Sequence, residues 1–222
     1  MTRRLISHLR YLALAVPNFD EERTFLTTYW GLTEVATDTV DGGRVSYLAA
    51  EGSPEPYVLR LREGEKRIDL VAFGAQDRAD ADALHARLAG AGVRIVHEPR
   101  ELTQPGGGYG MRFFDGDGRT VEVSTEVALR RNRKINPREP LPVKLSHVVV
   151  NTPNLPATTE WYIEHLDFAI SDTLFSAKMG DLMNFMRCNN AHHSFAIAQG
   201  PHASLHHASF EMRGVEEWMR GS

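Results

Sequence analysis

Apolar residues occur in short runs along most of the chain, and polar turns separate these runs. Runs rich in β-branched and aliphatic residues predict strands near residues 9–16, 33–39, 44–50, 56–61, 67–73, 93–97, 110–114 and 119–124. Residues 77–89 differ, because Ala83, Leu84 and Leu88 follow a helical period there and predict a helix. The pattern therefore indicates an α+β fold that is dominated by strands.

The chain also repeats itself. LRYLALAVPNF, from Leu9, matches LSHVVVNTPNL, from Leu145, and both segments close on a Pro-Asn pair at an offset of 136 residues. Residues 25–32 and 161–168 follow at the same offset, and both predict short amphipathic helices. Later, RIDLVAF and SLHHASF match at an offset of 137. Three matches in the same order indicate an internal duplication.

The two copies define a domain organisation. Residues 130–142 (RRNRKINPREPLP) are basic, contain prolines and show no periodicity, so they predict a linker. We expect an N-terminal domain over 1–129, a linker over 130–143 and a C-terminal domain over 144–222.

Composition narrows the class of protein. The net charge of −4, without a basic stripe, gives no support for a nucleic-acid partner. No apolar run reaches the ~18 residues that suggest a membrane span. The single cysteine, Cys188, cannot form an internal disulfide, which favours a reducing, cytoplasmic location.

Most of the ten histidines lie in the second copy, where three segments could carry chemistry. The first segment is LSHVVV, with His147, and the second is residues 185–198 (FMRCNNAHHSFAIA). The third is LHHASFEM, with His206 and His207. Because side chains alternate across a strand, we expect only one histidine of each tandem pair to face the interior of a barrel.

Three features together carry a family resemblance. The repeated βαβββ order, the FFDGDGRTVEV ending and the HVVVNTPNL opening resemble the vicinal oxygen chelate superfamily. The resemblance implies tandem βαβββ modules that form two open barrels, of which the second would be incomplete. The histidine segments resemble extradiol ring-cleaving dioxygenases of the dihydroxybiphenyl and catechol 2,3-cleaving type, which implies a small aromatic diol and dioxygen as substrates and a homo-oligomeric protein.

The resemblance also implies roles for individual residues. His147 and His207 would bind Fe(II), with Mn(II) as the alternative metal, since non-haem oxygenases use two imidazoles and one carboxylate on one face of the metal. His193 would act as the acid–base group, and Phe185 would line the aromatic pocket. The Cys-Asn-x-x-His-His motif selects His193, whereas the spacing from His207 selects His192. We favour the motif.

The first copy is an internal control for this interpretation. It has Tyr11 where the second copy has His147, and Leu70 where the second copy has His207. Glu122 alone occupies the position of a carboxylate ligand, so we expect a metal-free first module with Glu122 as a structural remnant or an interface residue. The spacing from Leu70 to Glu122 places the matching carboxylate of the second copy near position 259, beyond Ser222. We therefore expect weak Fe(II) binding and no ring cleavage from these 222 residues alone.

Two other functions fit the same fold. A glyoxalase-like isomerase usually draws carboxylates from both modules, which the tandem-histidine strand argues against. A metal-free binding protein of the bleomycin-resistance type is the other alternative. Metal content separates this last alternative from both enzymes.

Overall fold

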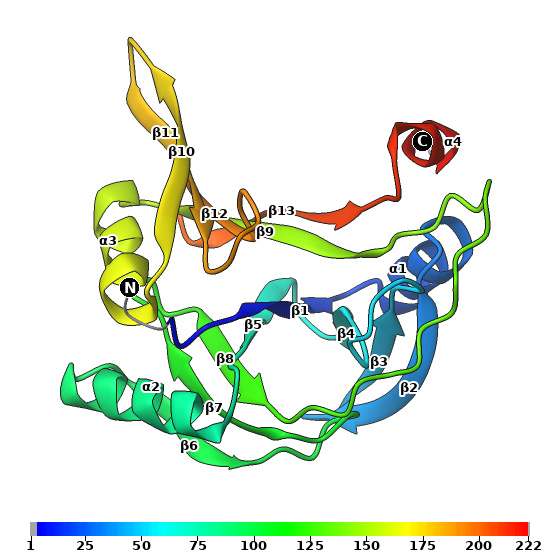
Figure 1. The fold of residues 1–222 in the computed structure, drawn as a ribbon, viewed down its shortest axis with the longest axis horizontal. Coiled ribbons are helices and arrows are strands. Elements are labelled where there is room, and N and C mark those ends of the chain that lie inside the picture. Colours follow the sequence, from blue (N-terminus) through cyan, green and yellow to red (C-terminus); the bar gives the residue numbers. More distant parts are fainter. Residues whose placement is uncertain (1–3, 222) are drawn as a thin grey trace.

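The computed structural model describes residues 4–221 and divides them between two sheets (Figure 1). The first part of the chain forms β1 (His8–Val16), α1 (Phe19–Thr24), a π-helical turn η1 (Phe25–Tyr29), β2 (Thr33–Val40), β3 (Gly43–Ala49) and β4 (Leu59–Glu63). It continues as β5 (Arg67–Gly74), α2 (Arg78–Gly90), β6 (Ile95–Glu101), β7 (Tyr109–Phe114) and β8 (Thr120–Thr125). The later part forms β9 (Lys144–Thr152), α3 (Leu155–Leu166), β10 (Ala169–Ser176), β11 (Gly180–Arg187), β12 (Phe195–Gln199), β13 (Ser204–Glu211) and α4 (Val215–Gly221). Between residues 4 and 221, no helix is long and apolar enough to cross a membrane.

The strand order shows how the repeats assemble. The first sheet has eight strands in the order β2-β3-β4-β1-β5-β8-β7-β6, so two βαβββ units meet where β1 lies antiparallel beside β5. The second sheet has five strands in the order β10-β11-β12-β9-β13. In it, β9 and β13 occupy the positions that β1 and β5 hold in the first sheet. The predicted α+β fold of tandem βαβββ modules with open sheets is confirmed.

The main core lies where the two sheets stack, with β9 packed against β1 (Figure 1). Phe73 of β5 contacts the second module there, since its ring lies 5.4 Å from Phe168 and 5.9 Å from Phe195. Strand alternation leaves a smaller apolar cluster on the other face of each sheet. We call these the first face (Tyr11, Ala13, Val45, Tyr47, Tyr57, Leu70 and Ala72) and the second face (Val149, Ala196 and Ala198, with Met183 and Phe185 against them).

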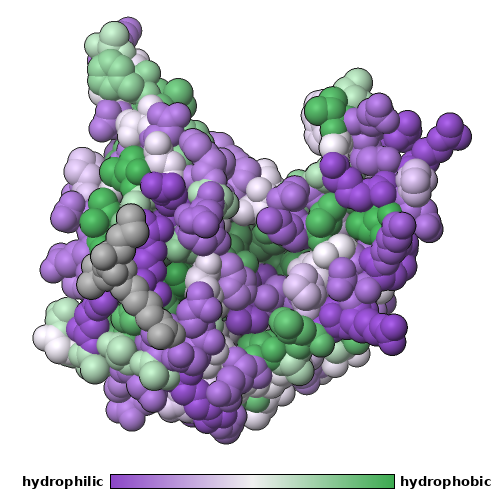
Figure 2. Space-filling model, viewed as in Figure 1, coloured by the Kyte–Doolittle hydropathy of each residue, from purple (hydrophilic) through white to green (hydrophobic). Residues whose placement is uncertain are grey.

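The second module carries two projections. The β10–β11 hairpin extends from one side and α4 from the other, and β9, β12 and β13 lie between them (Figure 1). The space-filling view shows the molecule hollowed between these projections (Figure 2). The hairpin exposes Leu174, Phe175 and Met179 to solvent.

Residues 126–143 contain no helix or strand and run between the modules. Arg213 fixes part of this segment, because its guanidinium donates to the carbonyls of Ile135 (2.8 Å) and Asn136 (2.6 Å). The domain limits at 129 and 144 remain a prediction.

Several predicted element boundaries were wrong. The helices predicted at 25–32 and 161–168 begin earlier, at Phe19 and Leu155. For the second helix the reason is local, because the Asn154 side chain accepts the Ala157 N–H (3.2 Å) and a proline occupies the first turn.

Two strand limits also differ, and both lie next to prolines. The strand predicted at 56–61 begins at Leu59, after Pro54 and Pro56, which lack an N–H for a sheet. The strand predicted at 93–97 runs on to Glu101, through Pro99, and tolerates this proline because the register shifts between His97 and Arg100.

Candidate metal centre

His147 and His207 lie on neighbouring strands and face each other. Strands β9 and β13 are antiparallel, with Val149 opposite His207 and His147 opposite Ser209. The two Nε2 atoms are 3.2 Å apart, and the rings cross at 81°. Two nitrogens bound side by side to one ion, each at about 2.1 Å, would be separated by about 3 Å. The pair therefore has the spacing of two adjacent ligands of one metal ion.

His193 and Phe185 complete a group around this pair. His193 follows β11 in the loop that leads to β12, and its ring centroid is 4.3 Å from that of His147. The Phe185 ring is 5.0 Å from His193 and 5.9 Å from His192. His193 is half-buried, whereas His192 is exposed, so the geometry favours His193 as the residue that faces the site. The structure brings all four predicted residues together, and their roles remain a proposal.

Burial keeps the site histidines neutral. Desolvation, followed by the neighbouring His193 and His207, lowers the pKa of His147 to about 4. Burial also lowers the pKa of His193 and of His207, with smaller effects from His192 and His206 respectively. Neutral imidazoles offer a nitrogen lone pair at physiological pH, as a metal ligand or a general base must.

The hydrogen bonds of the two rings also suit a metal ion. Nδ1 of His147 lies 3.3 Å from the Ser146 hydroxyl, and Nδ1 of His207 lies 2.7 Å from Nδ1 of His206. When both Nδ1 atoms carry the proton, two lone pairs face each other at Nε2, and a cation between them would relieve the repulsion. Imidazole pairs suit Fe(II) and its divalent neighbours.

The described residues provide no third candidate ligand beside the pair. Within residues 4–221 no group of three or more His, Cys, Asp or Glu side chains is placed to hold an ion. Glu211, on the same strand as His207, pairs with Lys144 at 3.1 Å instead. The site in this part of the chain is a two-imidazole pair.

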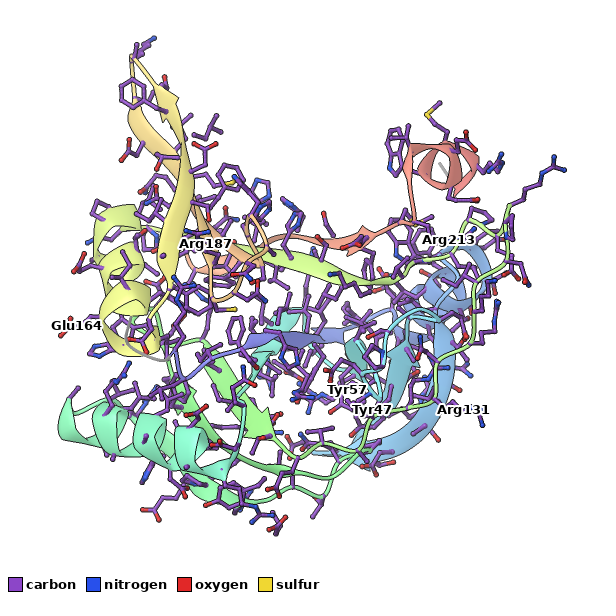
Figure 3. The ribbon with its side chains drawn as sticks, in the orientation of Figure 1. Tyr47, Tyr57, Arg131, Glu164, Arg187 and Arg213 are labelled. Atoms are coloured by element: carbon purple, nitrogen blue, oxygen red, sulfur yellow. The ribbon has the colours of Figure 1, made fainter. Side chains whose placement is uncertain are left out.

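The first face shows what occupies the same positions in the other module. Ala13 lies opposite Leu70 as Val149 lies opposite His207, and Tyr47 lies opposite Arg60 as Phe185 lies opposite Ala196. Tyr57 lies two residues before Leu59, where β4 begins, and His193 lies two residues before Phe195, where β12 begins. Since β4 and β12 pair with β1 and β9 at matching residues, Tyr57 corresponds to His193. Tyr57 and Tyr47 lie side by side inside the first module, with ring centroids 4.8 Å apart (Figure 3).

Glu122 is the centre of a buried hydrogen-bond network in the first module. Its carboxylate accepts from the Tyr11 hydroxyl (3.0 Å), Arg112 Nε (2.8 Å) and Gln104 Nε2 (3.0 Å), and the residue is 0% exposed. Burial, followed by the charge of Glu122, raises the pKa of Tyr11 well above its ordinary value, so the hydroxyl keeps its proton and donates it. Of the two roles considered for Glu122, the structure supports the internal one.

Sequence reasoning missed the correspondence of Tyr57 with His193 and of Tyr47 with Phe185. Extending the 136-residue offset to the fourth strand of the repeat would have found the first pair. It would also have shown that Arg60 and Arg62 of the first module are replaced by Ala196 and Ala198.

One histidine of each tandem pair is half-buried beside His147 and the other is exposed, as expected, but simple strand alternation is not the reason. In β13 the register passes from Leu205 to His207, so His206 is the extra residue of a β-bulge. A bulge re-aims side chains, which lets the rings of His206 and His207 lie 4.9 Å apart. His192 and His193 lie in a loop, where strand alternation does not apply.

A fold of tandem βαβββ modules with two facing imidazoles in an open sheet defines a candidate metalloprotein of the vicinal oxygen chelate type. The sequence pattern of the Glyoxalase/Bleomycin resistance protein/Dioxygenase superfamily matches residues 7–123 and 144–220, and the chain belongs to this superfamily.

Its relatives include enzymes named as extradiol dioxygenases. The chain is 25% identical to metapyrocatechase 2 of Cupriavidus necator, covering 99% of this chain and 70% of that protein. It is 26% identical to biphenyl-2,3-diol 1,2-dioxygenase of Paraburkholderia xenovorans (strain LB400), covering 96% and 73%.

Among solved structures, the chain resembles the Mn(II)-bound glyoxalase from Novosphingobium aromaticivorans. The identity is 39% and the TM-score 0.90, with 99% of this chain and 70% of the other covered. Homoprotocatechuate 2,3-dioxygenase from Brevibacterium fuscum, in complex with 3,4-dihydroxyphenylacetate, shares the fold at 21% identity, with a TM-score of 0.85 and coverage of 98% and 68%.

Proposed function

We propose that this protein cleaves a catechol-type aromatic diol with dioxygen, beside the diol, at a non-haem Fe(II) site, with Mn(II) as the other candidate metal. The observation that carries the proposal is the 3.2 Å separation of the His147 and His207 Nε2 atoms. The names of the relatives support the reaction type. A carboxylate would be the third ligand, as in other two-histidine oxygenase sites.

His147 and His207 would hold the metal, which would supply Lewis-acid coordination for the diol oxygens and redox chemistry for dioxygen. His193 has a different task, which is to take and return a proton of the substrate. Its Nδ1 lies 2.9 Å from Nδ1 of His192, so its Nε2 remains for the substrate hydroxyl. Its lowered pKa leaves the ring neutral, and a neutral imidazole is the form that accepts a proton.

The second face suits an aromatic ring. Val149, Ala196 and Ala198 are buried, and Phe185 and Met183 pack against them, so the wall beside the histidines is apolar. The small side chains of Ala196 and Ala198 replace the arginines of the first module and leave the face uncharged at these positions. Apolar walls with few polar groups are typical of small-molecule sites.

Metal binding tests the site directly. The 222-residue chain is titrated with Fe(II) under anaerobic conditions, beside His147→Ala, His207→Ala and the control His202→Ala, whose histidine is exposed in the loop before β13. We expect weak but measurable Fe(II) binding in the parent chain and the control, and its loss in the other two variants. Equal binding by all four would contradict the assignment of His147 and His207.

Oxygen uptake tests the reaction. With a panel of catechols and a chain that includes the carboxylate expected near position 259, we expect consumption of one dioxygen per ring cleaved. A protein that binds the metal and these diols but consumes no oxygen would refute the proposed activity.

A glyoxalase-like isomerase is the second candidate, because the 39% identical neighbour is named a glyoxalase. An isomerase would convert its substrate without consuming oxygen, so the same uptake measurement discriminates the two. A metal-free binding protein would contain no stoichiometric metal, either as the 222-residue chain or as the chain that includes the expected carboxylate.

A further inference from the structure

Each half-buried histidine of the two tandem pairs is contacted by its exposed neighbour through the same atoms. Nδ1 of His206 lies 2.7 Å from Nδ1 of His207, and Nδ1 of His192 lies 2.9 Å from Nδ1 of His193. In both pairs the outer ring is exposed and the inner ring is half-buried beside His147. The same contact between an exposed and a half-buried ring therefore occurs in both pairs.

The bulge in β13 explains how His206 reaches its neighbour. Without it, consecutive side chains would point to opposite faces of the sheet. The first module has its bulge at the matching residue, since Ala13 pairs with Leu70 and Leu14 pairs with Ile68, leaving Asp69 as the extra residue. Asp69 there accepts hydrogen bonds from Arg62 (2.6 Å) and Arg60 (3.0 Å), which lie on β4. In both modules, therefore, the bulged residue makes a hydrogen bond to another side chain.

We infer that His206 is a positioning residue that holds the His207 ring with its Nε2 lone pair directed at the metal site; this rests on the proposed function. In a hydrogen bond between two neutral rings, one Nδ1 donates and the other accepts. When His207 donates, its Nε2 is unprotonated and lies 3.2 Å from His147 Nε2. Metal-bound histidines commonly have their other ring nitrogen fixed in this way, and losing that partner typically costs ~10–100-fold in metal affinity. His192 stands in the same relation to His193.

The test reads the tautomer of His207 and the metal affinity separately. In the metal-free chain labelled with ¹⁵N-histidine, NMR reports which ring nitrogen carries the proton, and a Co(II) titration followed by visible absorption reports affinity. His206→Ala should move the His207 proton toward Nε2 and weaken Co(II) binding ~10–100-fold. His206→Asn, whose side-chain oxygen can accept the same hydrogen bond, should largely restore the His207 tautomer and the Co(II) affinity. His202→Ala should change neither the tautomer nor the affinity.

The outcomes separate this inference from the function it rests on. If His206→Ala leaves the tautomer and the affinity unchanged while His207→Ala abolishes Co(II) binding, the positioning role is refuted and the metal site stands. If His207→Ala does not affect Co(II) binding, the metal site itself is refuted. An equal loss with His206→Ala and His206→Asn, without a tautomer change, would also refute the positioning role.

Discussion

The two modules place different side chains at the same positions of the same fold. On the first face Tyr11 donates to the buried Glu122, and the ring centroids of Tyr11 and Tyr57 are 4.6 Å apart. The second face has His147 and His193 at the positions of these tyrosines, and their rings are 4.3 Å apart. The backbone of the two modules is equivalent here, and a few side chains distinguish the two faces. On the first face these side chains hydrogen-bond to one another, and on the second face they are histidines that we propose bind a ligand. Function therefore resides in these residues rather than in the fold.

The difference extends to charge. The first module buries Asp69 against Arg60 and Arg62, and the matching strand of the second module has Ala196 and Ala198 there. Arginine–carboxylate bonds fix their partners in one geometry. Alanines leave space and no charge, which suits a face that must admit an aromatic ring. At the matching positions the first module has buried ion pairs instead.

The largest effect should follow from breaking the network of the first face. Glu122→Ala leaves the Arg112 guanidinium and the Tyr11 hydroxyl without their buried partner. We expect a loss of about 3–5 kcal/mol in the free energy of unfolding, measured by urea denaturation, because removing one member of a buried pair leaves an uncompensated charge. Metal binding by the second module should persist in the folded fraction. A loss below about 1 kcal/mol would show that the network is not needed for stability.

The next effect comes from making the second face resemble the first. His207→Leu introduces the residue that the first module has at this position. We expect divalent metal affinity to fall by more than the ~10–100-fold seen when only an outer partner of a ligand is lost. Stability should change little, because the imidazole is half-buried and leucine suits the neighbouring apolar residues. The measurement is a Co(II) titration beside a urea denaturation curve. Retained Co(II) affinity would show that His207 is not what distinguishes the second face from the first.

A smaller effect concerns Asp69 and acid. Burial opposes ionisation of Asp69, but hydrogen bonds from Arg62 and Arg67 and the charge of Arg60 outweigh it and lower the pKa from 3.8 to about 2. A group with a lowered folded pKa stabilises the fold above its unfolded pKa and loses this contribution as the pH falls. We expect up to ~2 kcal/mol of stability to disappear between about pH 4 and pH 2. Asp69→Asn should flatten this part of the stability profile, and an unchanged slope would assign the acid sensitivity to other carboxylates.

The fold could be predicted from the sequence because its signals are local and repeated. The Pro-Asn pairs mark the same junction in both copies, and strand periodicity is a short-range property. His147 and His207 could be named because the strand segments that carry them resemble those of extradiol dioxygenases. The bulge at His206 could not be predicted, since it depends on pairing between β13 and β9 rather than on the pattern within one strand. The partners of Glu122 lie on separate strands and a loop, and only the folded structure brings Tyr11, Arg112 and Gln104 together.

The smallest effect tests the wall of the second face. Phe185 is half-buried on β11, beside His193, where its first-module counterpart is the buried Tyr47. Phe185→Ala should raise the KM for a bulky catechol such as a dihydroxybiphenyl by roughly 10-fold, since an aromatic contact contributes ~0.5–1.5 kcal/mol beyond its buried area. The KM for catechol itself should change less, because a single ring bound at the metal reaches less of this wall.

The same hairpin offers a matched control for this measurement. Phe175→Ala removes another phenylalanine side chain of the β10–β11 hairpin, one that is 64% exposed and is not among the ring contacts that the structure describes for His193. We expect Phe175→Ala to leave both KM values unchanged. The comparison is therefore between two identical substitutions on one hairpin, of which only one faces the histidines. If Phe185→Ala raises both KM values equally, the phenylalanine supports the histidines rather than the substrate, and the apolar second face would have to be explained by packing alone, as the first face is.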